Sequence, residues 1–160
     1  KFLKFGLAVL SLLIITACST TSNLVKTEHI TTAKHVAYSF ADPQDDIKQN
    51  EAYFQAALNQ KLKEKNIKLD QQNADTVLKY DFVFDEGNRA LRYFVGFGAG
   101  KATGKFKVSI VNKADNNLLA TVDTDASLSM GVFGGDAKQV LDNAAKDIAE
   151  KIDEANIFVK

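Results

Sequence analysis

The chain has 160 residues, of which 20 are basic and 20 are acidic, so its formal net charge is zero. This balance argues against a nucleic-acid-binding protein, which normally presents a strongly basic face. The length is typical of one domain, and the single cysteine excludes an internal disulfide framework and a cysteine-based zinc site.

Residues 1–17 have the pattern of an export signal. Lys1 and Lys4 form a basic region before an apolar run, FGLAVLSLLII, that is shorter than the roughly 20 residues of a membrane-spanning helix. The run ends in Ile15-Thr16-Ala17-Cys18, which resembles the lipobox of bacterial lipoproteins. That resemblance implies cleavage before Cys18, a diacylglycerol on its sulfur and an acyl chain on its new amino group. The alternative is an ordinary secretory signal followed by an accidental cysteine.

A lipid-bearing Cys18 would attach the mature chain to a membrane, since two or more acyl chains anchor a protein stably where one does not. In enteric lipoproteins an aspartate after the cysteine retains the protein in the inner membrane, and Ser19 resembles the outer-membrane type. We therefore expect an outer-membrane lipoprotein that faces the periplasm. Residues 18–34 are rich in Ser and Thr and poor in large apolar side chains, so they predict a flexible tether.

Residues 35–160 predict strands and helices in a definite order. HVAYSF, residues 35–40, predicts a strand, and apolar side chains at helical spacing over 47–65 predict a helix. Alternation then predicts a strand within 74–88, followed by a hairpin that turns around 114–117. A long helix ends the chain. The apolar stripes of the two helices are Ile47, Phe54, Leu58 and Leu62, and Leu141, Ala144, Ile148, Ile152 and Ala155; their predicted capping boxes are Asp46 with Gln49 and Asp136 with Gln139.

This order predicts an α+β domain over residues 35–160, with a strand, a helix, three or four strands and a second helix. One mainly antiparallel sheet with two helices packed on one face buries both apolar stripes. On the strand within 74–88, one face carries Leu78, Tyr80, Phe82 and Phe84, and in the first arm of the hairpin one face carries Phe106, Val108 and Ile110.

The glycine-rich segment RALRYFVGFGAGKATG, residues 89–104, is the most unusual stretch. It is not a Walker-type phosphate loop, because Val95 stands at the first glycine position and Ala102 at the Ser/Thr position. It is not a dinucleotide fingerprint, because Lys101 stands where the third glycine belongs. Its apolar run is too short to span a membrane.

Three interpretations of this segment stay open. Its glycines can allow the backbone to come close to the core. It can form a protein-docking surface, since aromatic residues and arginine are enriched at interfaces. It can also contact lipid headgroups through its basic side chains. The residues of the docking interpretation are Arg89, Arg92, Tyr93 and Phe97, and the cations of the lipid interpretation are Arg89, Arg92 and Lys101.

The glycine-rich segment and the later GVFGGD resemble an uncharacterised family of Gram-negative lipoproteins, a domain of unknown function with RxxRxxxGxGxGK and GxFGGD segments. The resemblance extends from about the first strand to the end of the chain, and it implies no established activity. The element order is also similar to the small domains of the curli-secretion-channel and TolB amino-terminal type, which act through protein contacts. The positions that match the uncharacterised lipoprotein family are Arg89, Arg92, Gly96, Gly98, Gly100, Gly131, Gly134 and Gly135.

Candidate catalytic and ligand-binding groups are few. His35 is the single histidine of the predicted domain, and we expect a packed or edge side chain rather than a base. Asp123 and Asp125 share one strand face and could bind a cation, although a solvated face is the simpler interpretation. We therefore expect no enzyme activity, no cofactor and no metal.

These observations predict a lipid-anchored, non-enzymatic module of protein interaction and envelope assembly, which contacts an envelope protein partner through Arg89, Arg92, Tyr93 and Phe97. We expect no nucleic-acid partner. The alternative function is a periplasmic module that binds lipid or a small ligand.

Replacing Cys18 tests the lipobox. In Cys18→Ala the acceptor sulfur is absent, so we expect most of the protein to move from the membrane fraction to the periplasmic fraction and to lose palmitate labelling. Ser19→Ala, which keeps the cysteine, serves as the control and should remain with the membranes. Sedimentation of Cys18→Ala with the membranes would contradict the lipoprotein interpretation.

Overall fold

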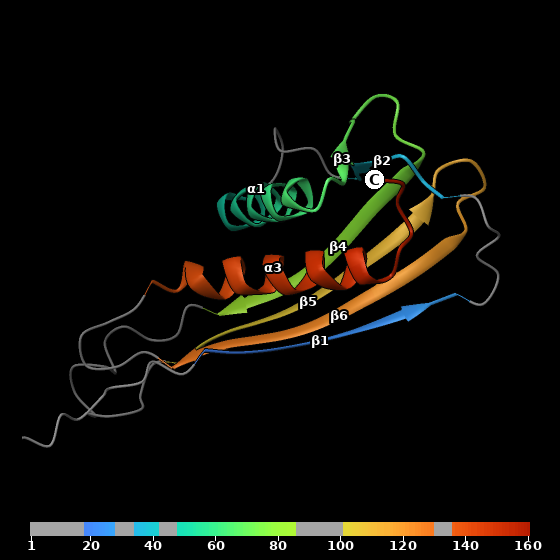
Figure 1. The fold of residues 1–160 in the computed structure, drawn as a ribbon. Coiled ribbons are helices and arrows are strands. Elements are labelled where there is room, and N and C mark those ends of the chain that lie inside the picture. The colour runs from blue at the N-terminus through green and yellow to red at the C-terminus, as the bar shows by residue number, and fades with distance from the viewer. Residues whose placement is uncertain (1–17, 28–33, 42–47, 86–100, 130–135) are drawn as a thin grey trace, which may run out of the picture.

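The computed structural model describes residues 18–27, 34–41, 48–85, 101–129 and 136–160. In these residues a six-stranded sheet lies beneath two helices, and both helices cover the same face (Figure 1). The elements are β1 (Cys18–Lys26), β2 (Ala37–Phe40), α1 (Gln49–Glu64), β3 (Lys68–Leu69), β4 (Thr76–Asp85), β5 (Lys101–Asn112), β6 (Leu118–Ser129) and α3 (Lys138–Glu154).

The strand order in the sheet is β1-β6-β5-β4-β2-β3. Three neighbouring pairs are antiparallel: β1 with β6, β6 with β5, and β5 with β4. Strand β2 pairs parallel with both β3 and β4. The predicted α+β class, with a mainly antiparallel sheet and two helices on one face, is therefore confirmed. The predicted hairpin is also present, because β5 and β6 pair along most of their length and are joined by residues 113–117.

Strand β1 was not predicted. Its nine residues belong to the segment expected to be a tether, yet they pair with β6 from Cys18 opposite Leu128 to Lys26 opposite Ala120. The expectation of a flexible tether is wrong for residues 18–26, and the described sheet includes these residues as well as those after residue 35. An edge strand is stabilised by one ladder and needs only half-buried side chains, so a Ser/Thr-rich sequence can form it.

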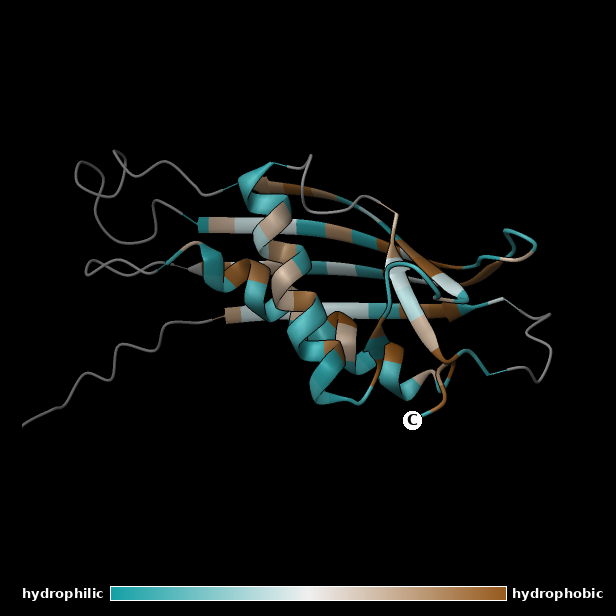
Figure 2. Ribbon diagram, turned by 90° about the horizontal axis from the view of Figure 1, so that it is seen from above, coloured by the Kyte–Doolittle hydropathy of each residue, from teal (hydrophilic) through white to brown (hydrophobic). Residues whose placement is uncertain are grey.

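The core lies between the sheet and the helices. Hydrophilic and hydrophobic residues alternate along the strands (Figure 2), and the hydrophobic set faces α1 and α3. The rings of Phe54, Phe82 and Phe106 come from α1, β4 and β5, with the Phe54 and Phe82 centroids 4.9 and 5.3 Å from that of Phe106. Three elements are therefore fixed to one another by one aromatic group. The described members of both predicted helical stripes are buried: Phe54, Leu58, Leu62, Leu141, Ala144, Ile148, Ile152 and Ala155.

The helix starts differ from the predicted capping boxes. Helix α1 has Lys48 as its N-cap, and the Glu51 carboxylate accepts a hydrogen bond from the Lys48 backbone N–H at 3.4 Å. Gln49 is thus the first helical residue, whereas Asp46 lies outside the described residues. Helix α3 has Ala137 as its N-cap, so the predicted box of Asp136 with Gln139 is wrong. Asp136 Oδ1 accepts a hydrogen bond from the Lys138 N–H at 3.0 Å, from one position before the cap.

Gly104 brings backbone and core side chains into close contact. A Cβ at this position would lie 2.5 Å from a ring carbon of Phe106 and 3.1 Å from a methyl group of Val140. The interpretation of the glycine-rich segment as a place of close backbone approach is therefore confirmed at Gly104. The earlier glycines of that segment lie outside the described residues.

Adding one methyl group to Gly104 should destabilise the fold. In Gly104→Ala the new Cβ must displace the Phe106 ring, which stacks on Phe54 and Phe82, so we expect the free energy of unfolding to fall by about 1–3 kcal/mol. Urea denaturation measures this change. Thr103→Ala, on the exposed face of the same strand, should change it by less than about 1 kcal/mol; equal effects would contradict the steric explanation.

Candidate functional site

Cys18 lies at the start of β1 and is exposed. Its strand neighbour is Leu128 of β6, which in turn pairs with Ala102 of β5. At this end of the sheet β1 and β5 begin and β4 and β6 end (Figure 1). We call it the anchor end, and its terminal residues are Cys18, Asp85, Lys101 and Ser129.

The thiol of Cys18 points toward the helix layer. The side-chain amide nitrogen of Asn143, in the second turn of α3, lies 2.6 Å from Cys18 Sγ. Because the thiol is both exposed and at the margin of the sheet, a substituent on the sulfur can leave the domain without disturbing the core.

The four predicted docking residues, Arg89, Arg92, Tyr93 and Phe97, lie outside the described residues. The chain leaves the described sheet at Asp85 and returns at Lys101. Both of these flanking residues belong to the anchor end, as Cys18 does. This proximity could not be predicted from the sequence, because it depends on how β1 and β4 are placed on either side of the hairpin.

The sheet face opposite α1 and α3 is not covered by any described element, and we call it the open face. Lysine and aspartate side chains stand in register across it. Lys107 of β5 lies between Asp81 of β4 and Asp123 of β6, and the neighbouring Lys105 lies opposite Asp125. Lys105 Nζ is 3.7 Å from Asp125 Oδ1, and both side chains are more than two thirds exposed. Such a solvated ion pair contributes at most about 1 kcal/mol, so its charges remain available to a partner.

Two adjoining hollows, of about 460 and 480 Å³, lie on the open face. The first is centred on the lysine and aspartate rows. The second extends toward the anchor end and reaches Asp85 and Lys101. The residues shared by the two are Val83, Lys105 and Asp125. Together the hollows form one continuous trough across four strands, with charged side chains and apolar surface in its lining.

Asp123 and Asp125 share the open face, as their alternation predicted. No group of three or more His, Cys, Asp or Glu side chains suited to a metal ion occurs among the described residues. Asp125 is paired with Lys105 instead. The contribution of Lys105 and Lys107 was missed from the sequence, although the alternation in KFKVSIV already put both on the face opposite Phe106.

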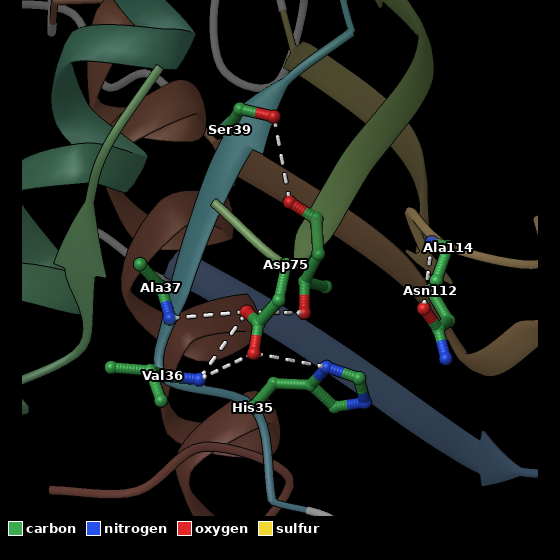
Figure 3. A network of polar contacts seen from close by, with 8 residues as sticks. His35, Val36, Ala37, Ser39, Asp75, Asn112 and Ala114 are labelled. Carbon is green, nitrogen blue, oxygen red and sulfur yellow. Dashed lines mark hydrogen bonds and ion pairs between the residues drawn. The ribbon is translucent and has the colours of Figure 1, made fainter. Parts of the chain in front are cut away.

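His35 is buried just before β2, at the end of the sheet opposite to the anchor end. Figure 3 shows its contact with Asp75. Its Nδ1 lies 3.5 Å from Oδ2 of Asp75. The Asp75 carboxylate also accepts hydrogen bonds from the backbone N–H groups of Val36 and Ala37, at 3.0 and 3.2 Å. Within the described part of the chain no serine or threonine hydroxyl is hydrogen-bonded to the imidazole. The arrangement joins the starts of β2 and β4.

The same group also fixes the C-terminal segment. His35 N–H donates to Ile157 O at 2.9 Å, and Val159 N–H donates to His35 O at 2.6 Å. His35 and Phe158 thereby form an isolated parallel bridge. The packed histidine that the sequence predicted is therefore present, and its contacts hold three chain segments together.

Burial opposes ionisation of Asp75, but the hydrogen bonds from Val36 and Ala37 and the neighbouring His35 outweigh it. The pKa of Asp75 is consequently below its ordinary value. Because the folded-state pKa is lowered, the carboxylate stabilises the fold at neutral pH. This contribution is lost as the pH falls from about 4, the unfolded value, through the folded value.

None of the helices among the described residues is long and apolar enough to cross a membrane. Residues 20–132, from β1 to just beyond β6, match the family described as a domain of unknown function (DUF4410). The chain belongs to this family. The expectation of a family without established activity is confirmed at this level. No curated protein sequence matches the chain.

Solved structures share the fold of this DUF4410 domain at low sequence identity. The PelC dodecamer from Paraburkholderia phytofirmans is 9% identical with a TM-score of 0.56, and the likeness covers 89% of this chain and 100% of that one. A PDZ domain protein from Parabacteroides distasonis is 10% identical with a TM-score of 0.57, covering 86% of this chain and 37% of that one. At these identities the likeness concerns the fold alone.

Replacing Asp75 by asparagine tests the cluster. Asp75→Asn removes the charge that receives the two backbone N–H groups, so we expect about 1 kcal/mol less stability at pH 7, a value reduced for the partly exposed carboxylate. The difference from wild type should shrink as the pH is lowered to 3, because the wild-type carboxylate is then becoming protonated. Chemical denaturation at several pH values measures it. Asp81→Asn on the open face is the control, and a pH-independent difference for Asp75→Asn would contradict the electrostatic cause.

Proposed function

We propose that this chain is an outer-membrane lipoprotein whose periplasmic domain binds another protein of the cell envelope, acts in envelope assembly and catalyses no reaction. The observation that carries the binding function is the open face. Its lysine and aspartate rows are solvated and its trough is continuous. The lipobox supports the anchor, and the exposed position of Cys18 supports it further, because lipidation requires no unfolding.

The chemistry of the open face favours a protein partner. Sites for small molecules are usually concave and largely enclosed, whereas this trough is open and charged side chains line it. Rows of alternating sign select a partner with the complementary order of charges and disfavour others by placing like charges together. The face is therefore suited to specific contact with a polar protein surface.

The shared fold adds support for a role in assembly. PelC, which has the same fold over 89% of this chain, forms a dodecamer. An α+β domain of this shape thus provides surfaces for protein–protein assembly in at least one other protein. This support concerns the architecture only, since function depends on the site rather than on the fold.

The segment with Arg89, Arg92, Tyr93 and Phe97 is proposed as a second part of the contact surface. It is joined to the sheet at Asp85 and Lys101, and both of these residues line the hollow nearer the anchor end. A partner that fills this hollow would therefore meet both ends of the segment.

Binding of lipid or a small ligand is the second candidate function, and the two hollows are the observation that favours it. Native mass spectrometry of the domain without its acyl chains would reveal a retained ligand. A ligand of constant mass that disappears in open-face variants would favour this function over protein binding.

Charge reversal on the open face tests the main proposal. We expect Lys105→Glu with Lys107→Glu to lower the yield of an in-cell photo-crosslinked partner at least tenfold, because both cations are exposed and central in the trough. Lys63→Glu with Lys65→Glu at the end of α1 reverses the same number of charges away from this face and should leave the yield unchanged.

Thermal unfolding checks that both double variants fold. The double variant Arg89→Ala with Arg92→Ala is measured in the same crosslinking experiment, as a test of the second part of the contact surface. Equal crosslinking in the open-face variant and in wild type would overturn the assignment of this face. Loss of crosslinking in both lysine-to-glutamate variants would indicate a general effect of charge and would also overturn it.

A further inference from the structure

The position of β1 determines how the domain is attached. In the lipoprotein proposed above, the lipid-bearing residue is Cys18, and Cys18 is also the first residue of the β1–β6 ladder. Only the cysteine side chain then separates the diacylglycerol from the sheet. No linker residue lies between the anchor and the fold, so the domain cannot move away from the bilayer while β1 remains paired.

The register places three further strand ends beside the anchor. Neighbouring strands are about 4.8 Å apart, so Ala102 lies about 10 Å from Cys18 and the end of β4 about 15 Å from it. The N-terminus of α3 is at the same end (Figure 1), and its Asn143 touches the Cys18 sulfur. The anchor is therefore surrounded by described structure on the side of β6 and on the side of α3.

The described residues give this end a polar surface. The large apolar side chains that are exposed in the described residues are Val25, Val36, Leu69, Val83, Leu118 and Val159. Among them only Val83 belongs to the half of the sheet nearest the anchor end, and it lies on the open face. Lys101 and Asp85 are exposed at the end itself. Such a surface fits the headgroup layer of a bilayer rather than its hydrocarbon core.

We propose, resting on the lipoprotein function above, that the anchor end is seated on the headgroups of the bilayer and that the strands lead away from it. Lys101 then meets lipid phosphate. The turn at 113–117 is the far point, because the twelve residues of β5 span about 40 Å. The open face stands along this direction and remains accessible to a partner in the periplasm.

Depth measurements along β5 test this orientation. Because the one cysteine of the chain is acylated, a second cysteine is the single free thiol and can be labelled with a small fluorophore. Three exposed positions form a series: Lys101→Cys, Lys107→Cys about 20 Å further along, and Ala114→Cys in the turn. Each acylated protein is reconstituted into phosphatidylethanolamine–phosphatidylglycerol vesicles that carry a nitroxide on the headgroup.

We expect strong quenching at residue 101, at least threefold less at residue 107 and none above background at residue 114. As a control, ten Gly/Ser residues are inserted between Cys18 and Ser19. Such a linker has a reach of about 17 Å, and it should weaken quenching at residue 101 and reduce the differences along the series. Urea denaturation of the same proteins checks that the labelled chains fold.

The outcomes separate this inference from the function on which it rests. Vesicle-bound protein with equal quenching at the three positions, or with the strongest quenching at residue 114, overturns the orientation alone. Purified wild-type protein that carries no acyl chains and does not bind the vesicles overturns the lipoprotein function and the orientation together. A gradient that is unchanged by the linker insertion overturns the claim that the direct junction at Cys18 sets the orientation.

Discussion

The pairing of β1 with β6 is the constraint on which the rest of the arrangement depends. It adds an edge strand to the hairpin and places Cys18 in register with the ends of three other strands. Ser22 and Thr124 form a hydroxyl contact of 2.5 Å across the pair, and half-buried Leu24 packs against the core. Because of this ladder, the cysteine that follows the signal-like segment has a defined location in the fold.

The apolar pattern was sufficient to predict most of the fold. The faces of β4 and β5, the hairpin and both helical stripes follow from burial of side chains at periods of 2 and 3.6. The pattern failed at β1, where Thr20 and Ser22 occupy positions that a sequence argument assigns to solvent. Hydrogen bonding to β6 supplies the stabilisation there, and pairing between segments a hundred residues apart leaves no local signal.

The candidate site was less predictable than the core. Alternation placed Asp123 and Asp125 on one face, but it did not show that Lys105 and Lys107 stand beside them, because register is set by the turn and the ladder. The same limit applies to ion pairs between side chains of one helix. Asp142 stands four residues before Lys146, the spacing of a favourable helical ion pair, yet it accepts a hydrogen bond from Tyr53 of α1, and Lys146 lies near Glu150. Tertiary contacts thus decide among partners that the sequence alone makes equally available.

The β1–β6 ladder also has a mechanical consequence. Cys18 is at the start of β1, whereas the group that holds the C-terminal segment, His35 with Asp75, is at the opposite end of the sheet. A force between these two ends acts parallel to the strands. The hydrogen bonds of an antiparallel ladder are perpendicular to the strands, so the force loads the hydrogen bonds of the whole β1–β6 ladder in shear at the same time instead of opening them one after another. The attachment is consequently strongest along the direction in which the domain would be drawn away from Cys18.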